Sequence, residues 1–288
     1  MDITKAFIKA KQPCTDGFRW YVRNARQDST YQELLDALVQ AGRVQDACWL
    51  LEQFGPTDAV LALDTLEAGD FVFAGTLQVR RGIDVDGVLM TGRGIRAGGG
   101  VRVGENLGAG GDVVCDGALI CGGALKAEGR LQAAWSIQVG GELDCEDLRV
   151  GWDLECEKSA TVRGHARIGQ VVRAGGGLHC AKNLQAGGGI ECVGDLSAGQ
   201  GIEAGDLLQG GGHVRAGWGI KVRGDLLAAG AIRAGESLCA EGEIRAGEGY
   251  GVYAGLDVRV QVWEDSARVH ASRLPEALRS GCWAGPLY

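Results

Sequence analysis

Ten cysteines and four histidines are the side chains of this 288-residue chain that are best suited to bind a transition metal ion, and the cysteines could also take part in redox chemistry. Zinc sites and thioredoxin-like redox sites use cysteines separated by two residues. The sequence contains no Cys-x-x-Cys pair, and the histidines are scattered: His165, His179, His213 and His270. We therefore expect no metal site and no cofactor.

Four runs of three glycines are a second candidate for chemistry, because Gly-rich loops can bind phosphate groups. They lie at residues 98–100, 175–177, 187–189 and 210–212. A P-loop requires Lys and then Ser or Thr directly after its last glycine, followed by a helix, and none of the four runs has these residues. The hydrolase motifs Gly-x-Ser-x-Gly and His-Glu-x-x-His are also absent. We therefore predict that the protein is not an enzyme.

A six-residue repeat explains the abundance of glycine and the positions of most cysteines. From Leu77 to Leu143 an apolar residue recurs every six positions; after a deletion of one residue, the register resumes at Leu148 and continues to Leu256. Two positions after each of these residues stands Ala, Val or Cys in nearly every unit, and four positions after it often stands Gly, as in LQAGGG at 184–189. Self-similarity at a fixed period indicates a repeat architecture.

The repeat predicts a mainly β fold, a triangular β-solenoid with three six-residue sides per coil. Alternation places the apolar and the small residue of each unit on the inner face of a short strand. Gly after the strand permits a tight corner. The repeat is long enough for about ten coils, each about 4.8 Å from the next. We expect six cysteines to point inward as small apolar residues, with Cys239 out of phase: Cys115, Cys121, Cys145, Cys156, Cys180 and Cys192.

The segments that flank the repeat have a different pattern. Thr30 and Glu33 form a capping box that opens a helix running to Gly42, a second helix is expected over residues 44–54, and an earlier one contains Trp20. We predict a helical N-terminal capping domain over residues 1–66, the solenoid over 67–260 and a C-terminal cap over 261–288. Such caps are expected because the bare end of a solenoid exposes sheet edges.

The repeat register also places exposed aromatic and basic residues. Trp135 and Trp152 are separated by one full coil, shortened by the deletion, which predicts the same corner on neighbouring coils. Trp218 also falls at a corner, and Arg215 and Arg233 are separated by three complete repeat units, which places them on one face. These aromatic residues either shield corners that lack Gly or form a binding surface, since exposed Trp and Arg are enriched at protein interfaces. We take these five residues as the candidate protein-binding site.

The charge balance restricts the partners. Twenty-nine basic and thirty-seven acidic residues give a net charge of −8. Direct binding to nucleic acid or to an anionic membrane needs a basic field, so we expect neither, and a basic protein partner is favoured. No stretch approaches the length of a membrane span, and the N-terminus lacks the layout of a secretory signal. We therefore expect a cytoplasmic protein.

The pattern Ile-Arg-Ala-Gly, at 232–235 and 244–247, resembles that of bactofilins, and the resemblance extends over roughly residues 77–260. This resemblance implies a triangular β-helix and the assembly of polymers, although bactofilin cores are shorter and carry flexible tails. Left-handed β-helix acyltransferases also have a six-residue period, but their unit has Gly directly after the aliphatic residue, where this sequence usually has a polar one. The small Trp-containing helical segment before Ala- and Gly-rich coils also resembles solenoid immunity partners of bacterial polymorphic toxins.

Three functions remain open at this point. The first is a non-enzymatic immunity protein that blocks a basic toxin domain sterically. The second is a bactofilin-like scaffold that forms polymers. The third is an acidic solenoid that mimics DNA, which the many outward arginines disfavour.

Overall fold

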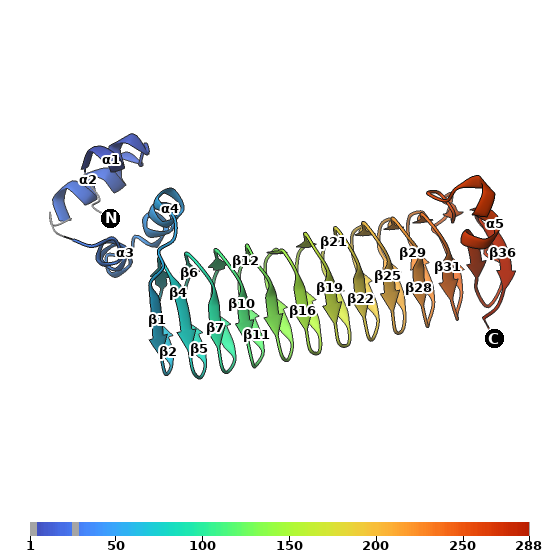
Figure 1. Cartoon of the computed structure of the whole chain (residues 1–288), viewed down its shortest axis with the longest axis horizontal. Coiled ribbons are helices and arrows are strands. Elements are labelled where there is room, and N and C mark those ends of the chain that lie inside the picture. The colour runs from blue at the N-terminus through green and yellow to red at the C-terminus, as the bar shows by residue number, and fades with distance from the viewer. Residues whose placement is uncertain (1–4, 25–28, 288) are drawn as a thin grey trace.

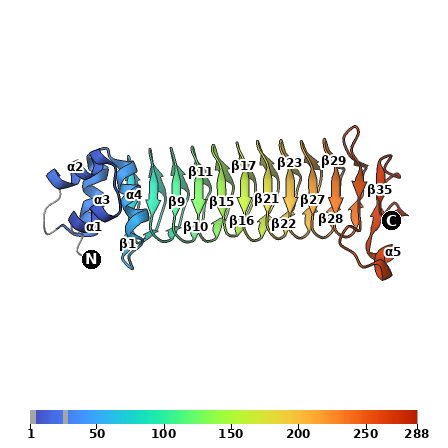
Figure 2. The same ribbon diagram turned by 90° about the horizontal axis from the view of Figure 1, so that it is seen from above.

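The protein is a three-sided rod with helices at its N-terminal end and a short irregular segment at its C-terminal end (Figure 1). The structure is a computed structural model that describes residues 5–24 and 29–287. The predicted terminal segments thus include residues 1–4, 25–28 and 288, which lie outside the described residues. The view from above shows the strands of successive coils stacked side by side along the rod (Figure 2). The predicted mainly β, triangular solenoid with N-terminal helices is confirmed.

Three parallel sheets form the sides of the rod, and each coil up to β32 contributes one strand to each sheet. Sheet A contains β1 (Val60–Leu63), β4 (Thr76–Val79), β7 (Ile95–Ala97), β10 (Val113–Cys115), β13 (Leu131–Ala133), β16 (Leu148–Val150), β19 (Ala166–Ile168), β22 (Leu184–Ala186), β25 (Ile202–Ala204), β28 (Ile220–Val222), β31 (Leu238–Ala240), β34 (Arg268–His270) and β36 (Cys282–Gly285). Sheet B contains β2 (Leu66–Ala68), β5 (Ile83–Val85), β8 (Val101–Val103), β11 (Leu119–Cys121), β14 (Ile137–Val139), β17 (Leu154–Cys156), β20 (Val172–Ala174), β23 (Ile190–Cys192), β26 (Leu208–Gly210), β29 (Leu226–Ala228) and β32 (Ile244–Arg245). Sheet C contains β3 (Phe71–Phe73), β6 (Leu89–Thr91), β9 (Leu107–Ala109), β12 (Leu125–Ala127), β15 (Leu143–Cys145), β18 (Ala160–Val162), β21 (Leu178–Cys180), β24 (Leu196–Ala198), β27 (Val214–Ala216), β30 (Ile232–Ala234), β33 (Val252–Tyr253) and β35 (Leu278–Ser280).

The strand register follows the six-residue repeat and its single deletion. Val113 pairs with Leu131, three complete repeat units later, whereas the partner of Leu131 is Leu148, which arrives one position early. The deletion therefore shortens one corner and leaves the stacking of the inward residues intact. Each coil is in this way held to the next by parallel main-chain hydrogen bonds.

The solenoid has about 13 turns, more than the ten expected, because it extends beyond the regular repeat at both ends. Its first strand begins at Val60, before residue 67. Leu61 pairs with Leu77 and Leu66 with Ile83, and both sequence spacings are shorter than three complete units. A search for residues six positions apart therefore misses the first coil. At the other end β34, β35 and β36 continue sheets A and C.

The interior of the rod is a single column of apolar side chains. The first and third residues of nearly every strand are buried, and the middle residue faces outward. The six cysteines predicted to point inward are at most 6% exposed, and Cys239, the middle residue of β31, is half-buried. Small residues such as Ala and Cys occupy this position because large aliphatic side chains already fill most of the thin core.

Within the described residues, four helices precede the first coil: α1 (Lys5–Ala10), α2 (Thr15–Asn24), α3 (Tyr31–Gln40) and α4 (Val44–Phe54). The predicted capping box opens α3, where Thr30 Oγ1 accepts from Glu33 N (3.3 Å) and Thr30 N donates to Glu33 Oε2 (2.7 Å). The predicted second helix, 44–54, coincides with α4. Helix α1 was not expected from the sequence.

Helix α3 covers the N-terminal edge of sheet C. The side-chain amide of Gln32 donates to Val72 O and its carbonyl accepts from Ala74 N, both at 2.9 Å. Val72 lies on β3, which is the terminal strand of sheet C. The amide of Gln32 thus takes the place of a peptide group from a missing neighbouring strand, and it satisfies two main-chain groups that would otherwise form an open edge.

The regular six-residue register ends after β32, earlier than the sequence predicts. Tyr250 and Leu256, expected to point inward, are 49% and 50% exposed. Val252 instead pairs with Ile232 and is fully buried, because this corner is longer than the regular one. The chain then forms the short helices η1 (Val260–Val262) and α5 (Trp263–Ser266). None of the described helices is long and apolar enough to cross a membrane.

Candidate functional site

The structure places Trp135 and Trp152 at the same corner, between sheets A and B, on neighbouring coils. Trp135 follows β13 and Trp152 follows β16, and Trp152 N donates a hydrogen bond to Trp135 O (3.2 Å). The two residues are 64% and 62% exposed. The shortened coil between them therefore produces the predicted adjacent placement, and the pair presents aromatic surface to solvent.

Trp218 lies at a different corner, between sheets C and A. It joins β27 to β28, and β28 is four strands beyond β16 along sheet A. Its main-chain N donates to Gln200 O (3.1 Å), and it is 50% exposed. The three tryptophans therefore form two separate features, one pair and one isolated residue.

Arg215 and Arg233 are direct neighbours on the outer face of sheet C, as their spacing of three complete units predicts. The guanidinium carbon of Arg233 lies 5.7 Å from the ring centroid of Tyr253, the next residue in this column. Neither arginine forms an ion pair with another described residue. Tyr253 was missed because the longer corner before it shifts it out of the repeat register.

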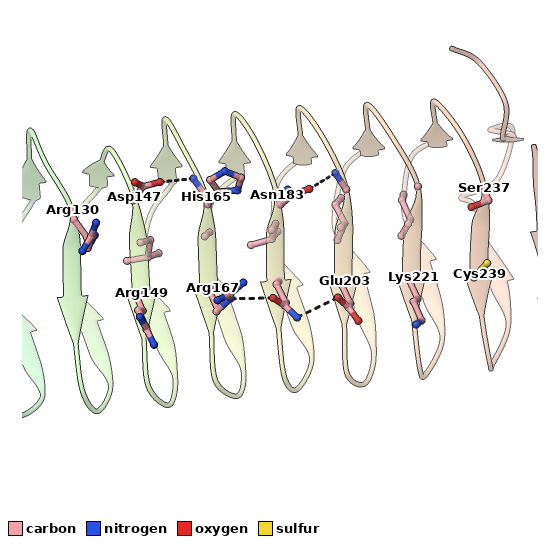
Figure 3. A pocket seen from close by; sticks show the side chains of 18 residues that line it. Arg130, Asp147, Arg149, His165, Arg167, Asn183, Glu203, Lys221, Ser237 and Cys239 are labelled. Carbon is pink, nitrogen blue, oxygen red and sulfur yellow. Dashed lines mark hydrogen bonds between the residues drawn. The ribbon is translucent and has the colours of Figure 1, made fainter. Parts of the chain in front are cut away.

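A groove along the outer face of sheet A was not predicted. It has a volume of about 760 Å³ and runs over the strands from β16 to β31 (Figure 3). The polar and charged side chains that line it come from the middle of the strands and from the corner that precedes each strand: Arg130, Asp147, Arg149, His165, Arg167, Asn183, Gln185, Glu203, Lys221 and Ser237. A second hollow of about 540 Å³ continues toward the N-terminal end and shares Arg130 with the first.

The groove carries more positive than negative charge. Arg167 Nε donates to Gln185 Oε1, and Gln185 Nε2 donates to Glu203 Oε2, each at 3.2 Å (Figure 3). Arg149 pairs in register with Arg167, so that two arginines stand side by side. Lys221 follows Glu203 along the same column, and no ion pair between them is formed.

Many acidic side chains lie at the corners and support the main chain. Asp147 Oδ1 accepts from His165 N (2.8 Å), Asp195 Oδ1 from His213 N (2.6 Å), and Asp225 Oδ1 from Glu243 N (2.7 Å). In each case the acceptor precedes a strand and the donor is its stacked neighbour on the next coil. Some of the acidic side chains of the rod therefore accept hydrogen bonds from the main chain of the next coil. The sequence signal for this role is an Asp, Asn or Ser directly before the strand, a position that the repeat analysis did not interpret.

The inward cysteines are protected from ionisation. Burial raises the pKa of the Cys145 thiol to about 12, and that of Cys115 and Cys192 to about 11. Thiolates, not thiols, bind metals and react as nucleophiles. Among residues 5–24 and 29–287, no cluster of three or more His, Cys, Asp or Glu side chains is arranged to hold a metal ion. These cysteines therefore serve as small core residues.

The fold and these surfaces define a three-sided parallel β-solenoid with a helical N-terminal region. Residues 1–55 match the family model described as the YdhT N-terminal domain. The matched segment ends one residue after α4, so the similarity covers α1 to α4 and none of the solenoid strands. No curated protein and no solved structure matches the chain.

Proposed function

We propose that the protein is a non-enzymatic protein-binding module, and specifically a cytoplasmic immunity protein that neutralises a toxin by covering its active site. The observation that carries the proposal is the exposed pair Trp135 and Trp152 on adjacent coils of one corner. Large aromatic side chains at the centre of an interface contribute a disproportionate share of the binding free energy.

The backbone that carries this pair favours tight binding. Main-chain hydrogen bonds to the coils on both sides hold the corner, from Trp135 N to Gly117 O and from Gln170 N to Trp152 O. A surface that is already ordered loses little conformational entropy when a partner binds. The net charge of −8 would accelerate association with a basic toxin domain. Arg215, Arg233 and Trp218 remain the second candidate patch of the same module.

The proposal is tested by co-purification and by growth protection against a toxin encoded beside this protein. We expect Trp135→Ala/Trp152→Ala to weaken toxin binding at least tenfold while the circular dichroism spectrum stays unchanged. Val193→Ala is the matched control, because Val193 is an apolar corner residue that is 69% exposed on another edge of the rod. Arg215→Glu/Arg233→Glu tests the second patch. Full protection by both double variants would refute the assignment of these surfaces.

A polymer-forming scaffold is the second candidate function, and one observation favours it. β1 and β2 are terminal strands of sheets A and B, with no further described strand paired to them. The apolar residues Leu61, Leu63 and Phe71 of the first coil are only half-buried, because no preceding coil covers them. Open strand edges with apolar neighbours promote association. Filaments in electron micrographs that are lost in Leu61→Lys/Leu63→Lys would favour the scaffold over the immunity protein.

A further inference from the structure

The groove on sheet A contains an arrangement of charges that differs from the pairing on sheet B. On sheet B, Arg102 pairs with Asp84 (2.6 Å) and Arg173 with Glu155 (3.3 Å), each across neighbouring strands. On sheet A, Arg149 stands beside Arg167. Like charges on directly opposed positions of a sheet are destabilising. A second adjacent pair, Arg215 and Arg233 on sheet C, lies beside the ring of Tyr253, whereas the pair on sheet A lines a groove together with Arg130, which offers a site for an external anion.

The neighbouring acidic groups of the described chain form no ion pair with Arg149 or Arg167. Asp147 is engaged by a main-chain N–H at the corner, and Glu203 accepts from the amide of Gln185. Arg149 forms no ion pair within the described part of the chain. Both Arg149 and Arg167 are exposed, so that their guanidinium groups are open to a ligand from solvent.

We infer that this groove binds an acidic polypeptide segment of a partner protein, with carboxylates over Arg130, Arg149 and Arg167. Arginine forms bidentate hydrogen bonds with carboxylates, which adds both strength and directionality. From Arg130 to Lys221 the groove crosses five coil spacings of about 4.8 Å, or about 24 Å in all. An extended segment of about seven residues covers this length at about 3.3 Å per residue.

Two observations favour a polypeptide over a single-stranded nucleic acid. No Trp, Tyr or Phe is among the described residues that line the groove, whereas proteins that bind single strands stack bases on aromatic side chains. A net charge of −8 also repels a polyphosphate, with one charge per nucleotide, more strongly than a peptide in which acidic and neutral residues alternate. A peptide can instead place a neutral or basic residue opposite Glu203 and carboxylates over the arginines.

The test is fluorescence anisotropy with a fluorescein-labelled octapeptide of alternating Glu and Ser, capped at both ends, in 50 mM salt. We expect binding to the full-length protein, weakening in 300 mM salt, and at least a tenfold loss in Arg149→Glu/Arg167→Glu. Arg223→Glu/Arg245→Glu is the matched control, because it changes the same number of charges at two exposed arginines that do not line the groove. We expect this control to bind the peptide with a Kd within about twofold of that of the wild-type protein. The remaining difference reflects the change in net charge.

Three results would overturn the inference. They are no binding by the wild-type protein, equal loss in both double variants, and tighter binding of an eight-nucleotide oligouridylate than of the Glu peptide. If Arg149→Glu/Arg167→Glu does not fold, Arg149→Gln/Arg167→Gln takes its place, since Gln185 already occupies this column. The inference does not rest on the immunity function, because the peptide assay changes arginines of the groove, whereas the growth assay changes the tryptophan pair and the arginines of sheet C.

Discussion

Replacing Gln32 by Ala tests whether helix α3 protects the N-terminal edge of sheet C. The amide of Gln32 makes two hydrogen bonds with this edge, to Val72 O and from Ala74 N. The substitution removes both and leaves a carbonyl and an N–H group without their partner. The same side chain also donates to Asp36 Oδ1 (2.8 Å), a contact within the exposed part of α3 that matters less.

The expected effect is local. Each hydrogen bond contributes about 0.5–1.5 kcal/mol net, and the two together about 2 kcal/mol. A change of about 1.4 kcal/mol is a factor of ten in an equilibrium constant, so amide hydrogen exchange at Ala74 should accelerate about 30-fold. Exchange in the central coils should not change, because each repeat of a solenoid contacts only its neighbours.

Hydrogen–deuterium exchange with mass spectrometry on peptides that span residues 70–76 measures this change. Gln40→Ala is the matched control, because Gln40 is an exposed residue at the end of the same helix. Unchanged exchange at 70–76 in Gln32→Ala would refute the role of Gln32 at the edge. Acceleration along the entire rod would show instead that the coils unfold as one unit.

Two further predictions concern the interior and the corners of the rod. At pH 8 a thiol reagent should modify the half-buried Cys239 before Cys192, because burial raises the pKa of the Cys192 thiol to about 11. Labelling of Cys192 should increase as the pH rises toward that pKa. Equal labelling rates of the two cysteines at pH 8 would contradict the register. Gly205→Ala should lower the free energy of unfolding by about 1–3 kcal/mol in urea titrations, because a Cβ there would overlap the carbonyl of Gly187 on the preceding coil. Gly201→Ala is the control and should have little effect, because its Cβ would lie 3.4 Å from the nearest atom, Asn183 Oδ1.

The regular part of the solenoid could be predicted because its determinants are local. The alternation of inward and outward side chains has a period of two, and the corner depends on small residues a few positions away. A deletion of one residue is visible as a break in this pattern, and so the pairing of Leu131 with Leu148 follows from the sequence. For the same reason the adjacent placement of Trp135 and Trp152 could be predicted from their spacing.

The ends of the solenoid could not be predicted, because there the register depends on pairing and not on a period. Tyr250 continues the six-residue spacing, yet Val252 occupies the core because it is the residue that pairs with Ile232. At the start, the spacing between Leu61 and Leu77 does not match the repeat, although the two residues are stacked. A search at a fixed period finds coils whose corners all have the same length. It misses a coil whose corners are longer or shorter.

The sequence by itself determined the class of fold, the inward residues and the columns in which side chains would stack. Only the tertiary structure decided which of the charged groups form ion pairs, which bind the main chain and which stand beside a like charge. The charge of −8 predicts an acidic surface, but Asp147 is bound to the main chain of the next coil, and Arg149 meets Arg167 with no carboxylate between them. Composition counts every charge equally, whereas the potential at a surface depends on which opposite charges lie within a few ångströms of each group.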